Sequence, residues 1–212
     1  MGWFWKAAAA AGMWLALGNV PVLAQSTGKT DFGAQRASDD ARFVADWVMD
    51  SADHRGMPFA LVDKKGAHIY VFDSSGRLSG SAPVLLGQTI GDDSAPEVGA
   101  HTQAGEVPMP ERTTPAGRYI SRPGRNLDGE HVVWVDYAAA LAIHRLRPGA
   151  SFRSREARLA SATPEDNRAS LGCVVVPAAF YDQVVQPVMG RTRAVVYVLP
   201  ETRPVHDVFG AL

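Results

Sequence analysis

The chain has 212 residues, of which 46% are hydrophobic and 20% charged, and its formal net charge at pH 7 is −1. This composition excludes an intrinsically disordered chain, because disordered chains combine low hydrophobicity with high net charge. It also argues against nucleic acid as a partner, since binding to phosphates needs a clustered excess of cations. The 20 glycines and 14 prolines indicate a turn-rich, mainly-β domain rather than a helical bundle.

The first residues have the pattern of a secretory signal peptide. One positive charge lies within residues 1–6, an uncharged apolar run covers 7–17, and small residues precede a cleavage site after Ala24. An uncleaved membrane anchor is the alternative, although the apolar run is shorter than the ~20 residues that cross a bilayer. We therefore expect an exported protein in a bacterial periplasm, without a transmembrane domain after cleavage.

The remainder of the chain divides into three predicted parts: a linker and N-terminal helix (25–56), a main domain (57–200) and a C-terminal tail (201–212). Ser38 is suited to cap the helix, with Asp39 and Asp40 in its first turn. Apolar residues then recur at helical spacing and predict a face that packs on the main domain, namely Phe43, Val44, Trp47 and Val48.

The main domain contains many short apolar runs separated by turn residues, which is typical of β-strands. A hairpin is predicted from runs 59–63 and 69–72, and Pro83 places a bulge or sheet edge in the strand 78–87. Further strands are predicted from 117 onward and at 131–137, 139–146, 171–176 and 194–199. Between them we expect a long functional loop (87–114), a short helix near 154–159, and a helix that begins at Pro177 and ends at Pro187.

Cys173 is the only cysteine, which excludes an intramolecular disulfide and a metal site made of several thiolates. The six histidines show no pair at the helical spacing of metal ligands, so we expect no metal site. We also expect no organic cofactor. A lone cysteine is either a small buried apolar residue or a functional thiol. Export favours the functional thiol, because an oxidising compartment disfavours a spare one.

The segment around this cysteine has features of a nucleophile loop. Gly172 lacks a side chain, so a substrate can approach the Cys173 thiol and backbone N–H groups can face it. His144 ends an apolar strand, and two strand ends joined by a long loop can meet in space. A histidine beside a thiol makes it a useful nucleophile. His101, in the long loop, is a second and weaker candidate for the base.

Three segments together resemble the L,D-transpeptidase family with the YkuD-type catalytic domain: Thr114-Pro115-Ala116-Gly117, Ala142-Ile143-His144 and Ser170-x-Gly172-Cys173. The resemblance extends roughly from Pro58 to Pro200. It implies a β-sandwich with one or two helices and an enzyme of cell wall organisation and cell shape. Such enzymes build 3→3 cross-links in peptidoglycan or attach proteins to it.

The resemblance also implies a role for each matching residue. Cys173 would be the nucleophile and His144 the base, with the backbone carbonyl of Arg145 orienting the imidazole. Ser170 would shape the loop, and the N–H groups of Gly172 and Cys173 would lie near the oxyanion. The substrates would be peptidoglycan stem peptides, and the acceptor another stem peptide, a protein lysine, a D-amino acid or water, the last giving L,D-carboxypeptidase activity.

The chain departs from the family at Leu171, where the family has His, and at Val175, where it often has Asn or Arg. The stretch between His144 and Cys173 is also longer than usual. The alternative is therefore a non-catalytic pseudoenzyme that binds peptidoglycan on the same scaffold. Arginines within 147–168 either contact carboxylates of stem peptides or belong to a solvated loop.

Overall fold

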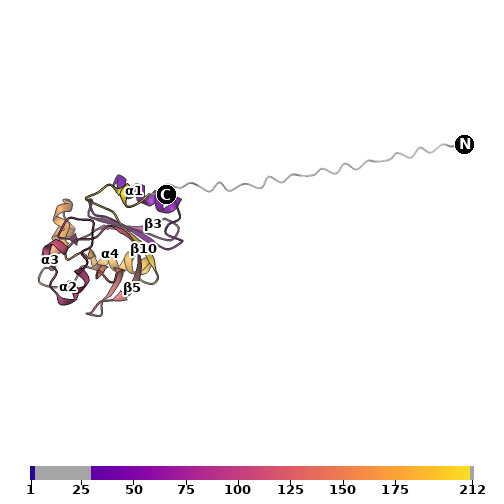
Figure 1. The fold of residues 1–212 in the computed structure, drawn as a ribbon. Coiled ribbons are helices and arrows are strands. Elements are labelled where there is room, and N and C mark those ends of the chain that lie inside the picture. The colour runs from indigo at the N-terminus through magenta and orange to yellow at the C-terminus, as the bar shows by residue number, and fades with distance from the viewer. Residues whose placement is uncertain (3–29, 211–212) are drawn as a thin grey trace.

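The structure is a computed structural model that describes residues 1–2 and 30–210 (Figure 1). The predicted signal peptide, with its cleavage site at Ala24, lies outside the described residues. In chain order the helices are α1 (Asp39–Asp50), α2 (Val98–Ala104), α3 (Phe152–Leu159), α4 (Ala178–Phe180) and α5 (Gln186–Met189). The strands are β1 (Phe59–Asp63), β2 (His68–Phe72), β3 (Leu78–Pro83), β4 (Leu86–Gly87), β5 (Gly117–Arg125), β6 (His131–Asp136), β7 (Leu141–Arg145), β8 (Arg168–Ser170), β9 (Val174–Val176) and β10 (Ala194–Val198). Short helical turns lie at Met109–Glu111, Pro164–Asn167, Tyr181–Val185 and Val205–Asp207.

Eight strands form one sheet in the order β3-β2-β1-β10-β5-β6-β7-β9, and β4 pairs with β8 in a separate two-stranded sheet. The pairs β1–β10 and β7–β9 are parallel, and the other neighbours in the large sheet are antiparallel. The predicted mainly-β class is confirmed. Pro83 ends the edge strand β3, in the position that its missing N–H favours.

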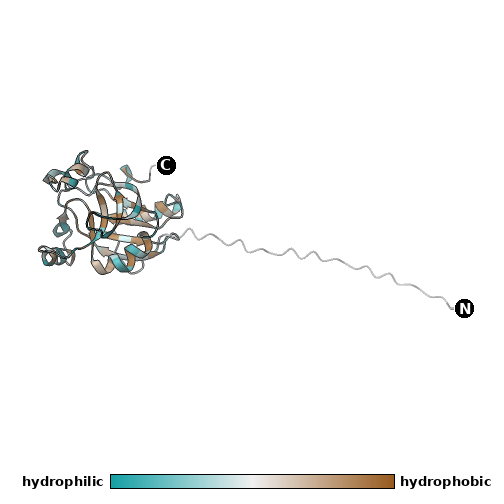
Figure 2. Ribbon diagram, turned by 90° about the horizontal axis from the view of Figure 1, so that it is seen from below, coloured by the Kyte–Doolittle hydropathy of each residue, from teal (hydrophilic) through white to brown (hydrophobic). Residues whose placement is uncertain are grey.

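One hydrophobic core joins the two halves of the large sheet. Val62 and Val71 come from the half formed by β1 and β2, and Val133, Ile143 and Val176 come from β6, β7 and β9. The predicted sandwich-like core is thus formed by the two halves of one continuous sheet and not by two separate sheets. Figure 2 shows the hydrophobic residues gathered along these central strands.

A second core lies on the other face of β1 and β10, where α1 packs. The Ser38 hydroxyl caps α1 by accepting from the Ala41 N–H at 3.1 Å, as the sequence predicts. Val44 and Val48 of α1 are fully buried against Phe59, and the C-terminal segment adds Phe209 to the same cluster, together with Phe32, Tyr70 and Tyr197. No helix within residues 30–210 is long and apolar enough to span a membrane.

Two local predictions were wrong. The long loop 87–114 contains the helix α2, which ends at Gly105 in the left-handed conformation. The helical segment after Pro177 continues through Pro187 to Met189 instead of ending at the proline. A π-helical turn at Tyr181–Val185 ends two residues before Pro187, and such a turn alters the hydrogen-bonding pattern that a proline would otherwise break.

Candidate active site

Cys173 lies directly before β9, at the end of a tight loop that only glycine fits. Gly172 has a φ of +137°, and a Cβ at that position would lie 2.9 Å from the carbonyl oxygen of Thr113. Because β-carbons do not approach backbone oxygens so closely, both the conformation and the packing need glycine here. The sequence motif therefore has a structural cause in this chain.

Ser170 fixes the shape of the loop with its hydroxyl group. Its Oγ donates to the carbonyl of Cys173 at 2.6 Å and accepts from the Gly172 N–H at 3.1 Å. The Gly172 N–H is therefore engaged within the loop in this structure, and it is not free to donate to a substrate oxyanion as the resemblance implies. A substrate would have to displace that bond to use this donor.

Thr114 clamps the same loop from the side. This residue is fully buried, its hydroxyl donates to the carbonyl of Gly172 at 2.7 Å, and the same oxygen accepts from the Gly87 N–H at 2.9 Å. The sequence shows Thr114 only as part of a motif and predicts no contact for it. A buried hydroxyl bonded on both sides holds the nucleophile loop against β4.

His144 is the fourth residue of β7 and lies level with Val175 of the parallel neighbour β9, two residues beyond Cys173. The imidazole Nδ1 is 2.9 Å from the carbonyl oxygen of Arg145. A carbonyl accepts only, so the proton lies on Nδ1 and the lone pair of Nε2 is left to accept a proton. The Arg145 side chain forms an ion pair with Asp182 at 2.8 Å, so the contact of Arg145 with the imidazole is made by its backbone carbonyl.

Burial favours the neutral forms of both His144 and Cys173. Burial lowers the pKa of His144 to about 4, the Arg145 carbonyl opposes this shift, and the cations of Arg147 and Arg155 reinforce it. Burial also raises the pKa of the Cys173 thiol, while the Ala142 N–H and the same two arginines act in the opposite direction. At neutral pH the site thus holds a thiol and an unprotonated imidazole, not an ion pair.

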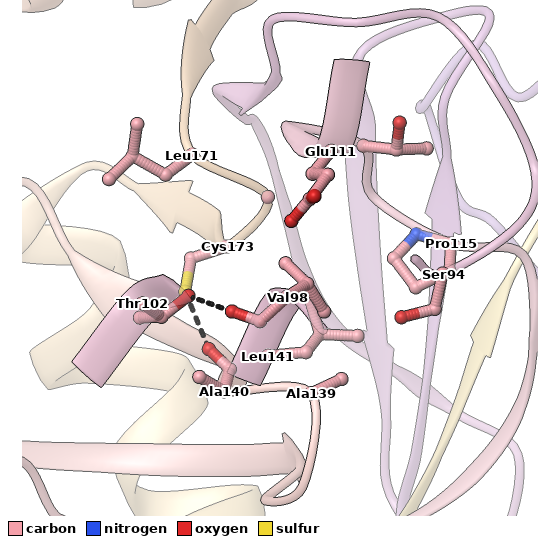
Figure 3. A pocket seen from close by; sticks show the side chains of 12 residues that line it. Ser94, Val98, Thr102, Glu111, Pro115, Ala139, Ala140, Leu141, Leu171 and Cys173 are labelled. Carbon is pink, nitrogen blue, oxygen red and sulfur yellow. Dashed lines mark hydrogen bonds between the residues drawn. The ribbon is translucent and has the colours of Figure 1, made fainter. Parts of the chain in front are cut away.

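The thiol does not donate to His144 in this arrangement. Within the described part of the chain, Cys173 Sγ donates to the carbonyl oxygen of Ala140 at 3.4 Å. Figure 3 shows the sulfur in a small cavity between α2, the turn before β7 and the nucleophile loop. The cavity measures about 30 Å³, room for about two water molecules, so it fits a small polar group but not a peptide chain.

The other histidines singled out by the sequence have partners of their own. His101, on α2, pairs with the Glu111 carboxylate at 2.6 Å, and Glu111 rather than His101 lines the cavity at Cys173. His131 bonds Tyr181 and Gly190 through its two ring nitrogens, as a structural histidine does. No cluster of three or more metal-ligating side chains occurs in residues 30–210.

The two positions that depart from the family motif have different surroundings. Leu171 is 48% exposed and lies at the rim of the cavity. Val175 is fully buried in a small apolar cluster with Leu85, Leu146 and Leu159, the last from α3. A polar side chain at position 175 would therefore be buried beneath α3 in this chain.

Comparisons with known proteins come only from solved structures, since no family model and no curated protein matches the chain. A mutant of Enterococcus faecium L,D-transpeptidase is similar with 14% identity and a TM-score of 0.37, over 68% of this chain and 50% of that one. The helical cell shape determining protein Pgp2 from Campylobacter jejuni gives 15% identity and a TM-score of 0.43, over 69% and 49%. The catalytic domain of the Enterococcus faecium enzyme gives 16% identity and a TM-score of 0.36, over 67% and 96%.

The chain spans about half the length of the first two of these proteins. With identities this low and TM-scores below 0.5, the comparisons assign the chain to no family.

Proposed function

We propose that the protein is a periplasmic, cysteine-dependent acyltransferase that acts on peptidoglycan stem peptides, that is, an L,D-transpeptidase. The observation that supports the proposal is that β7, which carries His144, and β9, which Cys173 directly precedes, are parallel neighbours, with His144 level with Val175 and its Nδ1 bonded to the Arg145 carbonyl. This leaves Nε2 as a base for a thiol that burial keeps protonated. The substrate class, peptidoglycan stem peptides, is inferred from the order of the three motif segments and from the predicted export signal.

In the first half-reaction, His144 Nε2 accepts the Cys173 proton and the sulfur attacks the carbonyl carbon of the third residue of a donor stem peptide. A C–S bond forms, and the carbonyl π bond opens to an oxyanion. The oxyanion then collapses, the amide C–N bond breaks, and the imidazolium returns its proton to the departing terminal D-Ala. The product is a thioester on Cys173.

In the second half-reaction, the amine of an acceptor attacks the thioester and gives a proton to His144. The C–S bond breaks and the proton returns to the sulfur, which restores the thiol. Water in place of the amine gives hydrolysis, the carboxypeptidase variant. Neither half-reaction needs a metal or an organic cofactor in the proposed scheme.

The resting geometry requires one local movement before the first proton transfer. In the proposed reaction the thiol leaves the Ala140 carbonyl and turns toward His144 Nε2 by rotation about the χ1 bond of Cys173. The peptide would lie across the mouth of the small cavity, beside Leu171, with only the reacting group entering it. The alternative, a non-catalytic peptidoglycan-binding module, would leave the thiol without a covalent role.

Intact mass spectrometry of the mature protein with a carbapenem separates these two functions. We expect one covalent adduct in the wild type and none in Cys173→Ala. His144→Ala should slow acylation severely, and His101→Ala, the matched control, should react at nearly the wild-type rate because His101 is paired with Glu111.

Two results would contradict the proposal. A wild-type protein that forms no adduct, together with an unchanged muropeptide profile on deletion of its gene, favours the binding module. Acylation that is lost in His101→Ala but kept in His144→Ala would show that His101, and not His144, is the base.

A further inference from the structure

A single charged side chain lines the cavity at Cys173. Glu111 ends the short helical turn Met109–Glu111, and no other charged residue occurs among the described residues that line this cavity. Figure 3 shows its carboxylate pointing into the cavity, on another side than the sulfur. The remaining lining residues are apolar or carry a hydroxyl group. The cavity therefore offers one carboxylate that the first half-reaction proposed above does not use.

The Glu111 carboxylate has a hydrogen-bond partner for only one of its oxygens. Oε2 accepts from His101 Nδ1 at 2.6 Å, and Oε1 has no hydrogen-bond partner among the described residues. The Glu111 side chain is only 19% exposed, against 39% for His101. Because a shielded carboxylate is poorly hydrated, its free oxygen favours a ligand that donates a hydrogen bond or carries a positive charge.

The position of Glu111 is fixed by segments that also build the site. His101 lies on α2, which packs on the turn before β7 so closely that a Cβ on Gly99 would lie 1.9 Å from the Ala138 carbonyl oxygen. Only glycine allows this approach. On the other side, the Glu111 carbonyl accepts from the Thr113 N–H at 2.8 Å, directly before the residue that clamps the nucleophile loop. The carboxylate is therefore held at a defined place beside the nucleophile loop.

We propose that Glu111 is the amine-recognition residue of this cavity, and that its free oxygen accepts an N–H of the acceptor side-chain amine that attacks the thioester on Cys173. The role of the amine as an acceptor rests on the proposed function above. An ammonium group is about the size of one water molecule, so it fits the cavity of about 30 Å³, and it donates without accepting. The ammonium first gives one proton to water, and the resulting amine attacks as described above.

The same carboxylate discriminates between two kinds of amine. A lysine-type side chain brings only its amine to the cavity. A free D-amino acid brings its own carboxylate on the same carbon, and like charges placed side by side repel each other. Glu111 therefore favours an amine that has no carboxylate next to it.

Disulfide formation at Cys173 with two matched reagents tests the role of Glu111 without relying on enzyme activity. 2-Aminoethyl methanethiosulfonate carries a primary ammonium group, and propyl methanethiosulfonate has a methyl group in its place. With both, the Cys173 sulfur forms a disulfide bond, the thiol proton goes to solvent and methanesulfinate leaves. The ratio of the two rates, aminoethyl over propyl, cancels any change in thiol ionisation and reports attraction of the ammonium.

We expect Glu111→Gln, which keeps the size of the side chain, to lower this ratio about threefold or more, the scale of one partly exposed ion pair. Glu111→Asp keeps the charge and should lower the ratio less. Glu106→Gln is the matched control, because it removes the same charge from an exposed residue of the same loop, and it should leave the ratio at the wild-type value. Cys173→Ser confirms that the modified residue is Cys173.

Aminolysis of the acyl-enzyme distinguishes the two sources of the amine. The thioester formed from a stem tetrapeptide is offered Nα-acetyl-lysine amide or D-alanine, and mass spectrometry measures each product. In Glu111→Gln we expect transfer to the lysine amine to fall about threefold, and transfer to D-alanine to change less. An equal fall for both amines would overturn the assignment to a side-chain amine.

An unchanged reagent ratio in Glu111→Gln overturns the proposal, and so does a wild-type thiol that neither reagent reaches. An equal loss in Glu106→Gln overturns it as well, because the effect would then come from net charge and not from the cavity. The proposed function fails separately: a carbapenem adduct with an unchanged ratio removes only the role of Glu111, and a lowered ratio without an adduct removes only the acyltransferase.

Discussion

At the scale of single residues, the site depends on one imidazole that is kept neutral. His144 is positioned by the carbonyl of the next residue, Arg145, and its proton affinity is lowered by burial and by two arginines. Cys173 is kept as a thiol by the same burial. In the proposed reaction such a pair must transfer a proton, which makes the rate dependent on the ionisation of His144.

The pH dependence of acylation follows from this lowered pKa. Only the unprotonated imidazole accepts a proton, so the rate should be constant from neutral pH down to about pH 5. It should fall as the pH drops through about 4, where His144 becomes charged. Acylation rates measured from pH 3.5 to 8, with circular dichroism to confirm folding, check this. An acid limb near 6.5, the value of an ordinary histidine, would contradict it.

Gly172 provides a second test at this scale. Gly172→Ala introduces a Cβ in an unfavourable backbone conformation and 2.9 Å from the Thr113 carbonyl oxygen, so the nucleophile loop must shift. We expect acylation to fall more than about tenfold, since small misplacements of a reacting group are costly. Gly149→Ala is the matched control, because Gly149 has a φ of +149° but no neighbour within 4 Å. Equal losses in the two variants would mean that the close contact is irrelevant.

At the scale of elements, the nucleophile loop is held between β4 and the start of β5 by one hydroxyl group. Thr114 joins Gly87 of β4 to Gly172 of the loop, and both bonds are buried. The loop is therefore fixed by segments distant in sequence, and not by its own turn alone.

Thr114→Val keeps the shape of the side chain but removes both bonds. We expect the free energy of unfolding to fall by about 1–3 kcal/mol, because the buried Gly87 N–H and Gly172 carbonyl lose a partner. Acylation should slow in the same variant. Urea unfolding and the carbapenem assay measure the two effects. Thr114→Ser keeps the hydroxyl and should retain more of both; a serine variant as impaired as valine would contradict the role of the hydroxyl.

At the scale of the whole molecule, a buried ionic network ties the long loop to the sheet and the C-terminal segment. The Lys64 ammonium is fully buried at the end of β1 and donates to Asp92 at 2.7 Å and to the Thr114 carbonyl at 2.9 Å. Glu201 lies 3.4 Å from the same nitrogen and also pairs with Arg168, at the start of β8. These contacts join the loop that lines the cavity to the strand that leads into the nucleophile loop.

Lys64→Met leaves the buried carboxylate of Asp92 without its main partner. We expect a loss of about 3–5 kcal/mol in the free energy of unfolding, the range for removing one member of a buried pair. The neighbouring Lys65 is the control, because its ion pair with Asp40 is at the surface and Lys65→Met should cost less than about 1 kcal/mol. Chemical denaturation measures the free energy of unfolding of both variants. Similar losses would show that burial does not make the Lys64 ion pair more stabilising than the surface pair.

Local pattern alone predicted much of the fold. The Ser38 cap and the apolar spacing of α1, the hairpin β1–β2 and the buried strand β10 all follow from short-range rules. Helix α2 was missed because its seven residues include two that favour turns or caps and no clear apolar periodicity. The continuation of the last helix through Pro187 depends on a π-helical turn, which no local sequence pattern predicts.

The sequence by itself determined the mainly-β class, the tight loop at Gly172 and the identity of Cys173 and His144 as candidates, because each depends on residue type and nearest neighbours along the chain. Only the tertiary structure decided that β7 and β9 are parallel neighbours, and that Thr114 and Lys64 brace the nucleophile loop. These features depend on contacts between segments far apart in the chain. Burial and charge compensation there are properties of the packed molecule, and no window of sequence contains them.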